Sequence, residues 1–377
     1  AMKKNYISAL AVLACVAVFC TISGNSFHQM RTATEEIIPG EGVTEVRMLS
    51  DYFPDLAGTA GDTQIYVLQG EQEGGSCLIL GGTHANELGG HMGAVLFVEN
   101  AKVEAGTLYV IPRTNNSAFT HNDPQEGHPS TVHITTDEGN VREFIHGSRA
   151  TNPVDQWPDP DVYVNYMGQS LSGSENRNIN RTYPGKADGT LTEMMSYGIV
   201  QLINTENIDV TVDLHEASPE YPVINALIAH ERAMNLASNV VVDMQMEGVQ
   251  ISLEPSPTDL RGLTHRELGD HTDTLALLME APNPAQGRLR DRTDEALVLT
   301  GKSETYVKAG EIGQLYVPYD ENGWPIEVRC ARHVFGIERI LANYSEMYEE
   351  PIIVTGMPSY DELVKNGMGP YLNEPTT

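Results

Sequence analysis

The feature that most constrains the fold is a series of short, nearly uninterrupted apolar runs that alternate with segments of helical periodicity. Such runs are typical of strands buried on both faces, and helices between them indicate a parallel sheet. The sequence predicts an α/β fold with a mostly parallel or mixed central sheet and helices on both faces. The predicted strands are 64–70, 77–82, 107–112, 208–215, 223–230 and 274–282, and the predicted helices are 86–98, 191–205, 232–246, 295–308 and 334–348.

One long segment interrupts this alternation. Residues from about 114 to 180 are rich in Pro, Asn, Asp and Gly, and they contain one hairpin pattern, TVHITTDEGNVREF. A loop of this length inside a compact domain is usually functional. We therefore expect the segment to shape the mouth of a binding site.

The first 26 residues have the organisation of a targeting segment. Lys3 and Lys4 precede an apolar run from Ile7 to Ile22, and the small polar stretch SGNS follows. These are the parts of a secretory signal peptide, and the run is shorter than the roughly 20 apolar residues of a membrane span. We predict an exported protein with a cleaved signal peptide. An uncleaved membrane anchor and a lipoprotein signal ending at Cys15 are the alternatives.

Outside this segment the chain has two cysteines, Cys77 and Cys330. An oxidising compartment would allow them to form one disulfide. Two buried thiols are an equal alternative, because Cys77 lies within an apolar strand pattern.

Three predicted strands lead directly into side chains that bind metals or transfer protons. CLILGG is followed by His84 and Glu87, VTVDL by His215, and LALLM by Glu280. In open α/β sheets, ligands bind beyond the carboxyl ends of the strands, so we expect these groups at one edge of the sheet. Two His and one Glu are a common ligand set for catalytic zinc, with the fourth position left for water.

The spacing of these residues suits such a site. His84 and Glu87 are three residues apart and can face one ion across a turn, which the two preceding glycines allow the chain to make. Asp213 lies two residues before His215, on the same face of the strand, where it could orient the imidazole. Glu280 is then free to act as general base on a metal-bound water.

Other polar residues near these motifs fit the chemistry less well. His91 is interpreted as a residue of the helix surface, and Glu216 as a carboxylate that either supports a ligand or lies on the surface. Pro219 stands where an HExxH motif starting at His215 would need its second His, and no GxSxG or GxGxxG motif occurs. Four histidines of the long segment are interpreted as solvated or substrate-lining: His121, His128, His133 and His146.

Taken in order, GGTHANELGG, NINRTYPG, VDLHEA and LLMEAP resemble the zinc carboxypeptidase superfamily, and most closely its succinylglutamate desuccinylase/aspartoacylase branch. That family has the pattern His-x-x-Glu, Asn-Arg, a distant His and a Glu at a strand end. HxxE is a weak motif by itself, whereas the ordered set of four is specific. The resemblance covers residues from about 60 to 285.

The resemblance implies a zinc enzyme. One Zn2+ ion would be bound by His84, Glu87 and His215, and Glu280 would be the general base and proton shuttle. Zinc lowers the pKa of a bound water to near 7, so hydroxide is available at neutral pH. The implied reaction is the hydrolysis of an amide.

The resemblance also implies residues that bind the substrate. Asn180 and Arg181 match the pair that binds a substrate carboxylate, which Arg can hold bidentately. Arg177 is the first candidate for stabilising the oxyanion, and Arg113 and Arg149 are the alternatives. The substrate is therefore expected to be a small peptide with a free C-terminus or an N-acyl amino acid.

These observations predict an exported zinc-dependent amide hydrolase, and the alternative is a catalytically weak or inactive binding protein on the same fold. We assign residues 27–350 to the catalytic domain and 351–377 to a C-terminal extension. The net charge of −29 disfavours nucleic acid and anionic membrane surfaces as partners, because like charges repel. Any contact with a membrane is expected only through an uncleaved N-terminal segment.

Overall fold

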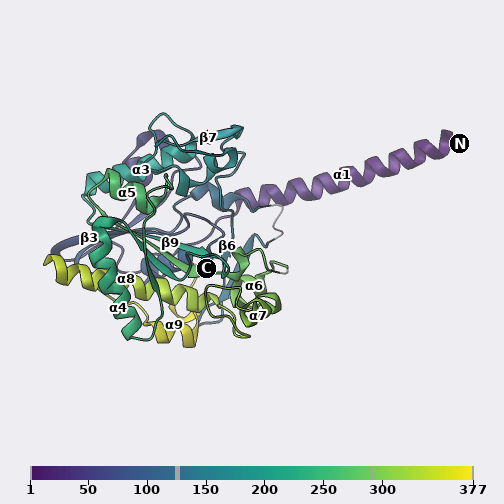
Figure 1. Ribbon diagram of the computed structural model, residues 1–377. Coiled ribbons are helices and arrows are strands. Elements are labelled where there is room, and N and C mark those ends of the chain that lie inside the picture. The colour runs from purple at the N-terminus through teal and green to yellow at the C-terminus, as the bar shows by residue number, and fades with distance from the viewer. Residues whose placement is uncertain (1, 124–127, 291, 376–377) are drawn as a thin grey trace. The chain divides into compact units, whose positions relative to one another are not determined.

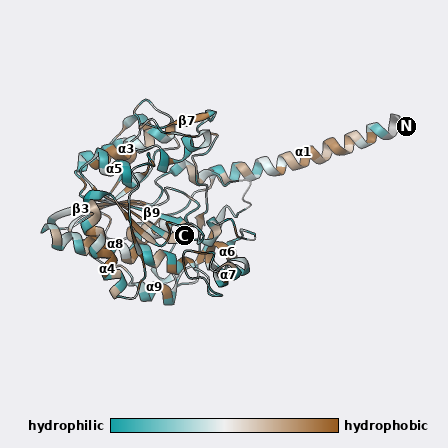
Figure 2. Cartoon of the chain, viewed as in Figure 1, coloured by the Kyte–Doolittle hydropathy of each residue, from teal (hydrophilic) through white to brown (hydrophobic). Residues whose placement is uncertain are grey.

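The computed structural model describes residues 2–123, 128–290 and 292–375, and it divides the chain into two units, Ala1–Glu35 and Glu36–Thr377. The smaller unit is built around α1 (Met2–Thr32). Within the described residues, α1 is the one helix that is long and apolar enough to cross a membrane, and Figure 2 shows apolar residues along much of it. It extends ten residues beyond the predicted apolar run, to Thr32.

The larger unit contains a mixed sheet of nine strands. Its order is β1-β2-β4-β3-β9-β12-β10-β11, with β13 also paired to β4. The central pairs β4–β3, β3–β9 and β9–β12 are parallel. The predicted α/β fold with a mostly parallel or mixed sheet is therefore confirmed. The strands are β1 (Glu45–Met48), β2 (Gln64–Gln69), β3 (Gln72–Leu80), β4 (Lys102–Ile111), β9 (Val210–Ala217), β10 (Ala226–Ala229), β11 (Ser252–Pro255), β12 (Leu275–Pro282) and β13 (Ile353–Thr355).

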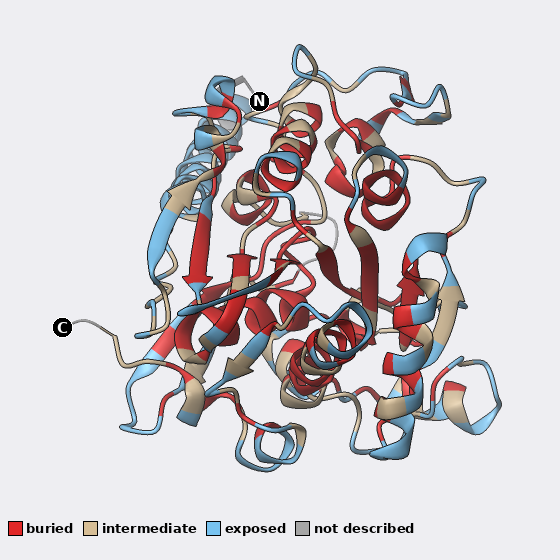
Figure 3. Ribbon diagram, turned by 90° about the vertical axis from the view of Figure 1, so that its left-hand side faces the viewer, coloured by how far each residue is buried: buried red, intermediate tan, exposed pale blue. Residues whose placement is uncertain are grey.

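Helices cover both faces of the sheet (Figure 1). Successive side chains of β3 point to opposite faces, so Cys77 and Ile79 pack with α2 (Leu88–Asn100), α4 (Met234–Met246) and α8 (Ile326–Tyr348). Leu78 and Leu80 pack on the other face with α3 (Leu191–Glu206) and α5 (Thr264–His271). Figure 3 shows the resulting buried centre of the sheet. The remaining helices are α6 (Glu295–Thr300), α7 (Glu304–Glu311) and α9 (Tyr360–Asn366).

Two predicted helices differ from the observed ones. The helix predicted at 295–308 is split, because Gly301 adopts φ +59° and ends α6, and the Ser303 side chain then caps α7. Helix α8 begins at Ile326, eight residues before the predicted start. Its first turns bury Arg329 and Arg332, and these charged residues obscured the apolar periodicity.

The long segment from 114 to 180 contains two small hairpins. The predicted one is formed by β5 (Thr131–Thr135) and β6 (Val141–Ile145), and a second, β7 (Val162–Val164) with β8 (Ser170–Ser172), was not predicted. Residues 124–127 of this segment lie outside the described residues. The thiols of Cys77 and Cys330 are free and buried, as the second alternative for them predicts.

Helix α2 approaches β9 closely through glycines. A Cβ atom added to Gly90 would overlap the carbonyl oxygen of Leu214, which belongs to the backbone of β9. One turn further along α2, a Cβ added to Gly93 would lie 3.3 Å from the Cβ of His333, a contact that a small shift could accommodate. The first turn of α2 is therefore held against the strand more tightly than the second.

We expect Gly90→Ala to destabilise the protein by about 1–3 kcal/mol, the usual cost of overpacking a rigid contact. Gly93→Ala is the matched control, and it should cost less because alanine also favours the helix. Denaturant unfolding of both variants measures the difference. A Gly90→Ala variant as stable as the unmodified protein would show that α2 can move away from β9 without cost.

Candidate metal centre

The carboxyl ends of β3 and β9 bring three possible metal ligands together. The ligand atoms of His84, Glu87 and His215 all lie within 4.8 Å of one another, and all three side chains are buried. Because β3 and β9 are parallel neighbours with Leu80 opposite Asp213, both strands deliver their residues to the same edge. The structure therefore juxtaposes the three residues that the sequence proposed as ligands.

The turn between β3 and α2 points His84 and Glu87 towards the same place. Gly82 adopts φ +61°, a conformation that glycine permits without strain, and the chain then enters α2 with Glu87 at its N-cap. Glu87 Oε1 lies 2.7 Å from His84 Nδ1, and Glu87 Oε2 lies 2.9 Å from His215 Nδ1. One carboxylate thus faces the Nδ1 atoms of both imidazoles.

The other nitrogen of each imidazole has an oxygen partner. His215 Nε2 lies 2.8 Å from Asp213 Oδ2, so Asp213 reaches this imidazole as the sequence suggested. His84 Nε2 lies 2.9 Å from the side-chain oxygen of Asn178. A ring nitrogen that donates to such a partner leaves the lone pair of the opposite nitrogen available to a metal. Sequence reasoning missed Asn178, although it is the first residue of the motif NINRTYPG.

The electrostatics of His84 and Glu87 suit a cation. Burial opposes ionisation of Glu87, but attraction by His84 and His215 outweighs it and holds the pKa of this carboxyl well below its usual range. Burial, with the nearby Arg149, lowers the pKa of His84 to about 4. His84 is therefore neutral and Glu87 ionised at neutral pH, which are the forms that bind metal ions.

His215 differs from His84. Burial disfavours its protonated form, but Asp213 and Glu87 outweigh burial and raise the pKa of His215 well above its ordinary value. A metal that binds here must displace that proton, so binding is coupled to proton release.

Glu280 lies on β12, directly opposite His215 in the parallel register. Its Oε2 atom is buried and has no hydrogen-bond partner among the described residues. Burial raises the pKa of Glu280 to about 8, and the attraction of His215 offsets this effect only in part. The carboxyl can therefore take up and release a proton near neutral pH.

The structure separates the candidate arginines. Arg149 Nη1 lies 3.3 Å from both His84 Nδ1 and Glu87 Oε1. Arg177 instead forms a bidentate ion pair with Asp159, at 2.7 and 2.9 Å, and it also donates to the carbonyl of Thr151. The guanidinium of the first candidate is thus committed to partners in the long segment, whereas that of Arg149 contacts the ligand cluster.

Arg113, the third candidate, lies with its guanidinium 4.5 Å from the centre of the Phe119 ring.

The side-chain oxygen of Asn180 accepts from the backbone and hydroxyl of Thr264, at 2.8 and 3.0 Å. Asn180 therefore holds its loop in place, and only its amide group is left for a ligand.

Arg181 is held near the cluster by its own loop. It donates to the Asn180 carbonyl at 2.6 Å, and its Nε lies 3.7 Å from Glu175. Burial and the repulsion of Arg149 lower the pKa of Arg181, and Glu280 acts on it with the opposite sign. The two arginines and Glu280 are thus close enough to interact electrostatically.

Several histidines lie elsewhere than predicted. His91 is fully buried, and its Nδ1 lies 2.8 Å from the Pro112 carbonyl, so its interpretation as a surface residue was wrong. His128 and His146 are also buried, with their Nδ1 atoms 3.1 Å apart, and are not solvated. For His128 and His146, composition could not show this, because buried and solvated loops contain the same polar residue types.

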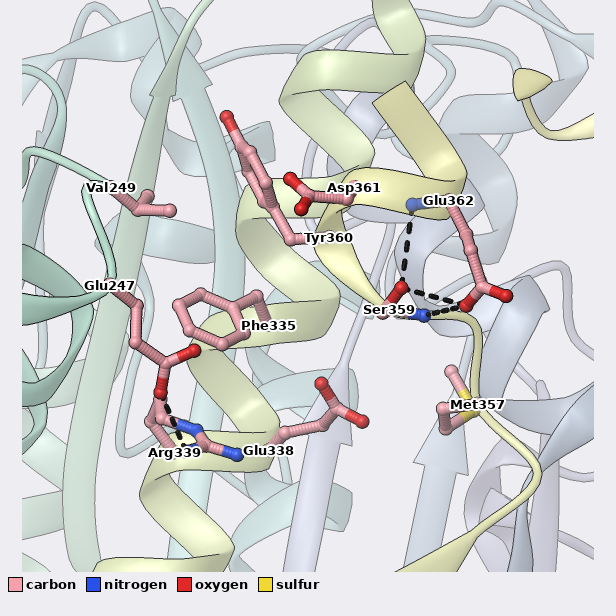
Figure 4. Close-up of a pocket in the computed structure, with 10 residues that line it drawn as sticks. All are labelled: Glu247, Val249, Phe335, Glu338, Arg339, Met357, Ser359, Tyr360, Asp361 and Glu362. Carbon is pink, nitrogen blue, oxygen red and sulfur yellow. Dashed lines mark hydrogen bonds and ion pairs between the residues drawn. The ribbon is translucent and has the colours of Figure 1, made fainter. Parts of the chain in front are cut away.

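A pocket of about 360 Å³ lies between α8, α9 and the segment after α4 (Figure 4). Phe335 and Tyr360 line it together with several charged groups, among them Arg339, which lies 3.1 Å from Glu247. None of the predicted site residues lines this pocket.

No model of a known protein family matches the sequence, and no curated protein matches it. The chain is nevertheless similar to solved structures. One is a succinylglutamate desuccinylase from a Silicibacter species, with 16% identity, a TM-score of 0.42, and coverage of 75% of this chain and 61% of the other. The chain thus spans about three fifths of that protein.

Two further solved structures are similar to the chain. A metallo-carboxypeptidase from Burkholderia cenocepacia has 11% identity and a TM-score of 0.45, over 85% of this chain and 68% of the other. A cell shape determinant protein from Helicobacter pylori has 13% identity and a TM-score of 0.46, over 80% and 59%.

The raised pKa of Glu280 makes the stability of the metal-free protein depend on pH. The protonated form is favoured by folding, so its contribution is complete below the unfolded value of about 4.5 and is lost as the pH rises through about 8. We expect the difference in unfolding free energy between the unmodified protein and Glu280→Gln to decline across this window. Chelator-treated protein, unfolded by denaturant at several pH values, measures it. If the difference in unfolding free energy does not change with pH, the pKa of Glu280 is not raised in the folded protein.

Proposed function

We propose that the chain is an exported, zinc-dependent amide hydrolase that acts on a substrate bearing a carboxylate. One observation carries this proposal: three buried side chains, His84, Glu87 and His215, converge beside a Glu280 carboxyl, one oxygen of which has no partner in the part of the chain that the structure describes. A buried polar atom without a partner is costly unless a ligand or reacting group supplies one. Metal ligands next to an unpaired acid are what metal-assisted hydrolysis requires.

The donor set fits Zn2+. Two imidazole nitrogens and one carboxylate are a frequent protein ligand set for catalytic zinc. The close approach of Arg149 to His84 and Glu87 also indicates that this cluster stabilises positive charge. When bound by His84, Glu87 and His215, zinc would polarise the substrate carbonyl and lower the pKa of water.

Glu280 is positioned to transfer the protons. Ionised, it takes the proton of the attacking water, and protonated, it gives that proton to the leaving amine. Its elevated pKa makes both forms accessible near neutral pH.

Arg149 would stabilise the oxyanion that develops on the carbonyl oxygen. Its guanidinium adjoins the ligand cluster and is about half exposed, so a substrate can reach it. Arg181, with the free amide group of Asn180, would bind the substrate carboxylate. This arrangement suits a peptide C-terminus or an N-acyl amino acid equally, and the net charge of −29 would repel nucleic acid.

Export rests on the N-terminal unit. Helix α1 has the length and composition of a signal sequence or a membrane anchor. In either role it would direct the hydrolase out of the cytoplasm. Small peptides, including those of cell walls, are available there as substrates.

Two substrate sets test the function. The zinc-loaded protein is offered peptides with free C-termini and a series of N-acyl amino acids, and amine release is measured. We expect hydrolysis of one set, and Glu280→Gln should retain zinc but lose at least about a hundredfold in kcat. Glu338→Gln is the matched control, because burial also raises the pKa of that glutamate, to about 7, and it lines the other pocket.

The outcomes separate the alternatives. A protein that holds no zinc after reconstitution would rule out the proposed function. Zinc binding without hydrolysis of either set would favour the binding-protein alternative. Undiminished hydrolysis by Glu280→Gln would exclude this residue as the base.

The arginine assignment has its own test. We expect Arg149→Met to reduce kcat by about 10²–10³, as loss of an oxyanion donor does, with little change in KM. Arg177→Met should reduce thermal stability, because it leaves Asp159 unpaired, with a smaller effect on kcat. If Arg177→Met has the larger effect on kcat at equal folded fraction, the original assignment to Arg177 holds.

A further inference from the structure

A buried ion pair lies directly behind the ligand cluster. Glu216, the residue after His215, lies with Oε1 2.8 Å from Arg329 Nη1, and neither side chain is exposed. Arg329 comes from α8 and also donates to the carbonyl of Val298 in α6. The end of β9 is thereby tied to two helices that contribute no predicted ligand.

Glu216 also connects the other elements of the site. Its backbone N–H donates to Glu87 Oε2 at 3.0 Å, so the position of this peptide sets where the Glu87 carboxylate lies. Its Oε2 accepts from Asn283 at 2.8 Å, and Asn283 follows the strand that carries Glu280. Asn283 in turn donates from its backbone to the Ala217 carbonyl at 2.7 Å.

Gly89 makes room for this carboxylate. A Cβ atom at position 89 would overlap Glu216 Oε1 and approach the Cβ of Arg329 to 3.3 Å. The carboxylate therefore lies against the first turn of α2, whose N-cap is Glu87. The Glu216 side chain therefore contacts both the start of α2, where Glu87 lies, and Asn283, which follows the strand that carries Glu280.

An ion pair at this depth needs a reason other than stability. The desolvation of two charges offsets most of their attraction, and apolar residues of similar volume often stabilise a core as well. What such a pair provides is a fixed geometry, because moving either partner leaves a buried charge unpaired.

We propose that Glu216 and Arg329 are positioning residues that hold Glu87 in place for the metal ion and the Glu280 strand beside it. This inference rests on the proposed metal site. It concerns how tightly and with what geometry the ion is held, so it can be tested by metal binding without any substrate.

The test compares two buried ion pairs, one that packs against the first turn of α2 and one that includes Glu99 in its last turn. Arg329→Met breaks the Glu216 pair, and Arg142→Met breaks the pair between Arg142 and Glu99, whose atoms are 2.7 Å apart with side chains 3% and 0% exposed. Glu99 lies at the opposite end of α2, about 18 Å from Glu87 at 1.5 Å per residue. Zinc affinity of the full chain is measured by competition with a chelator, and the cobalt-substituted protein reports the coordination geometry by its absorption spectrum.

We expect Arg329→Met to weaken zinc binding by at least about tenfold and to alter the cobalt spectrum, the usual scale for loss of a group that orients a ligand. Arg142→Met should lower the melting temperature about as much as Arg329→Met does, but it should keep the zinc affinity within about threefold of the unmodified protein. Wild-type affinity in Arg329→Met, or an equal loss in Arg142→Met, would overturn the proposal.

Glu216→Gln keeps the inference testable if Arg329→Met does not fold. Glutamine preserves the volume and one hydrogen bond but not the charge, so we expect a several-fold loss of zinc affinity and a shifted cobalt spectrum. Unchanged affinity and spectrum would overturn the positioning role. Absence of zinc binding by the unmodified protein would instead contradict the proposed function itself.

Discussion

The site depends on the Glu87 carboxylate, which lies between two imidazoles that come from different elements. One oxygen faces His84, and the other faces His215 and the backbone N–H of Glu216. A buried carboxylate is stable only when its oxygens are paired, so α2 cannot shift along β9 without a large penalty. Gly90 removes the side chain that would otherwise keep the helix away from the strand.

Two carboxylates in this site have opposite environments. Glu87 is surrounded by partners and stays ionised, whereas Glu280 has an oxygen that no described residue pairs with and a pKa of about 8. Such a difference allows one site to contain both a carboxylate that stays ionised and a carboxyl that exchanges a proton. Asp213 and Asn178 each contact the Nε2 atom of a histidine, His215 and His84 respectively. The Nδ1 atom of each histidine therefore faces Glu87.

The sequence predicted the sheet and the convergence of its strand ends well, because both follow from local patterns. Apolar runs such as CLILGG reveal buried strands, and the carboxyl ends of parallel strands share one edge. It was less informative where a contact crosses the fold. Asn178 lies 94 residues after the histidine that it contacts, and Arg149 reaches the cluster from a segment without periodicity. The early start of α8 was hidden by Arg329, whose partner Glu216 is 113 residues away.

The sequence by itself determined which chemical groups are available and at which ends of which strands they stand, because strand periodicity and the order of motifs are local properties of the chain. Only the tertiary structure decided which arginine adjoins the cluster, which carboxylates have partners, and that Glu216 is buried in an ion pair. These properties depend on contacts between residues that are far apart in the sequence, because burial and pairing set the charge of a group. The spacing of residues along the chain does not determine such contacts.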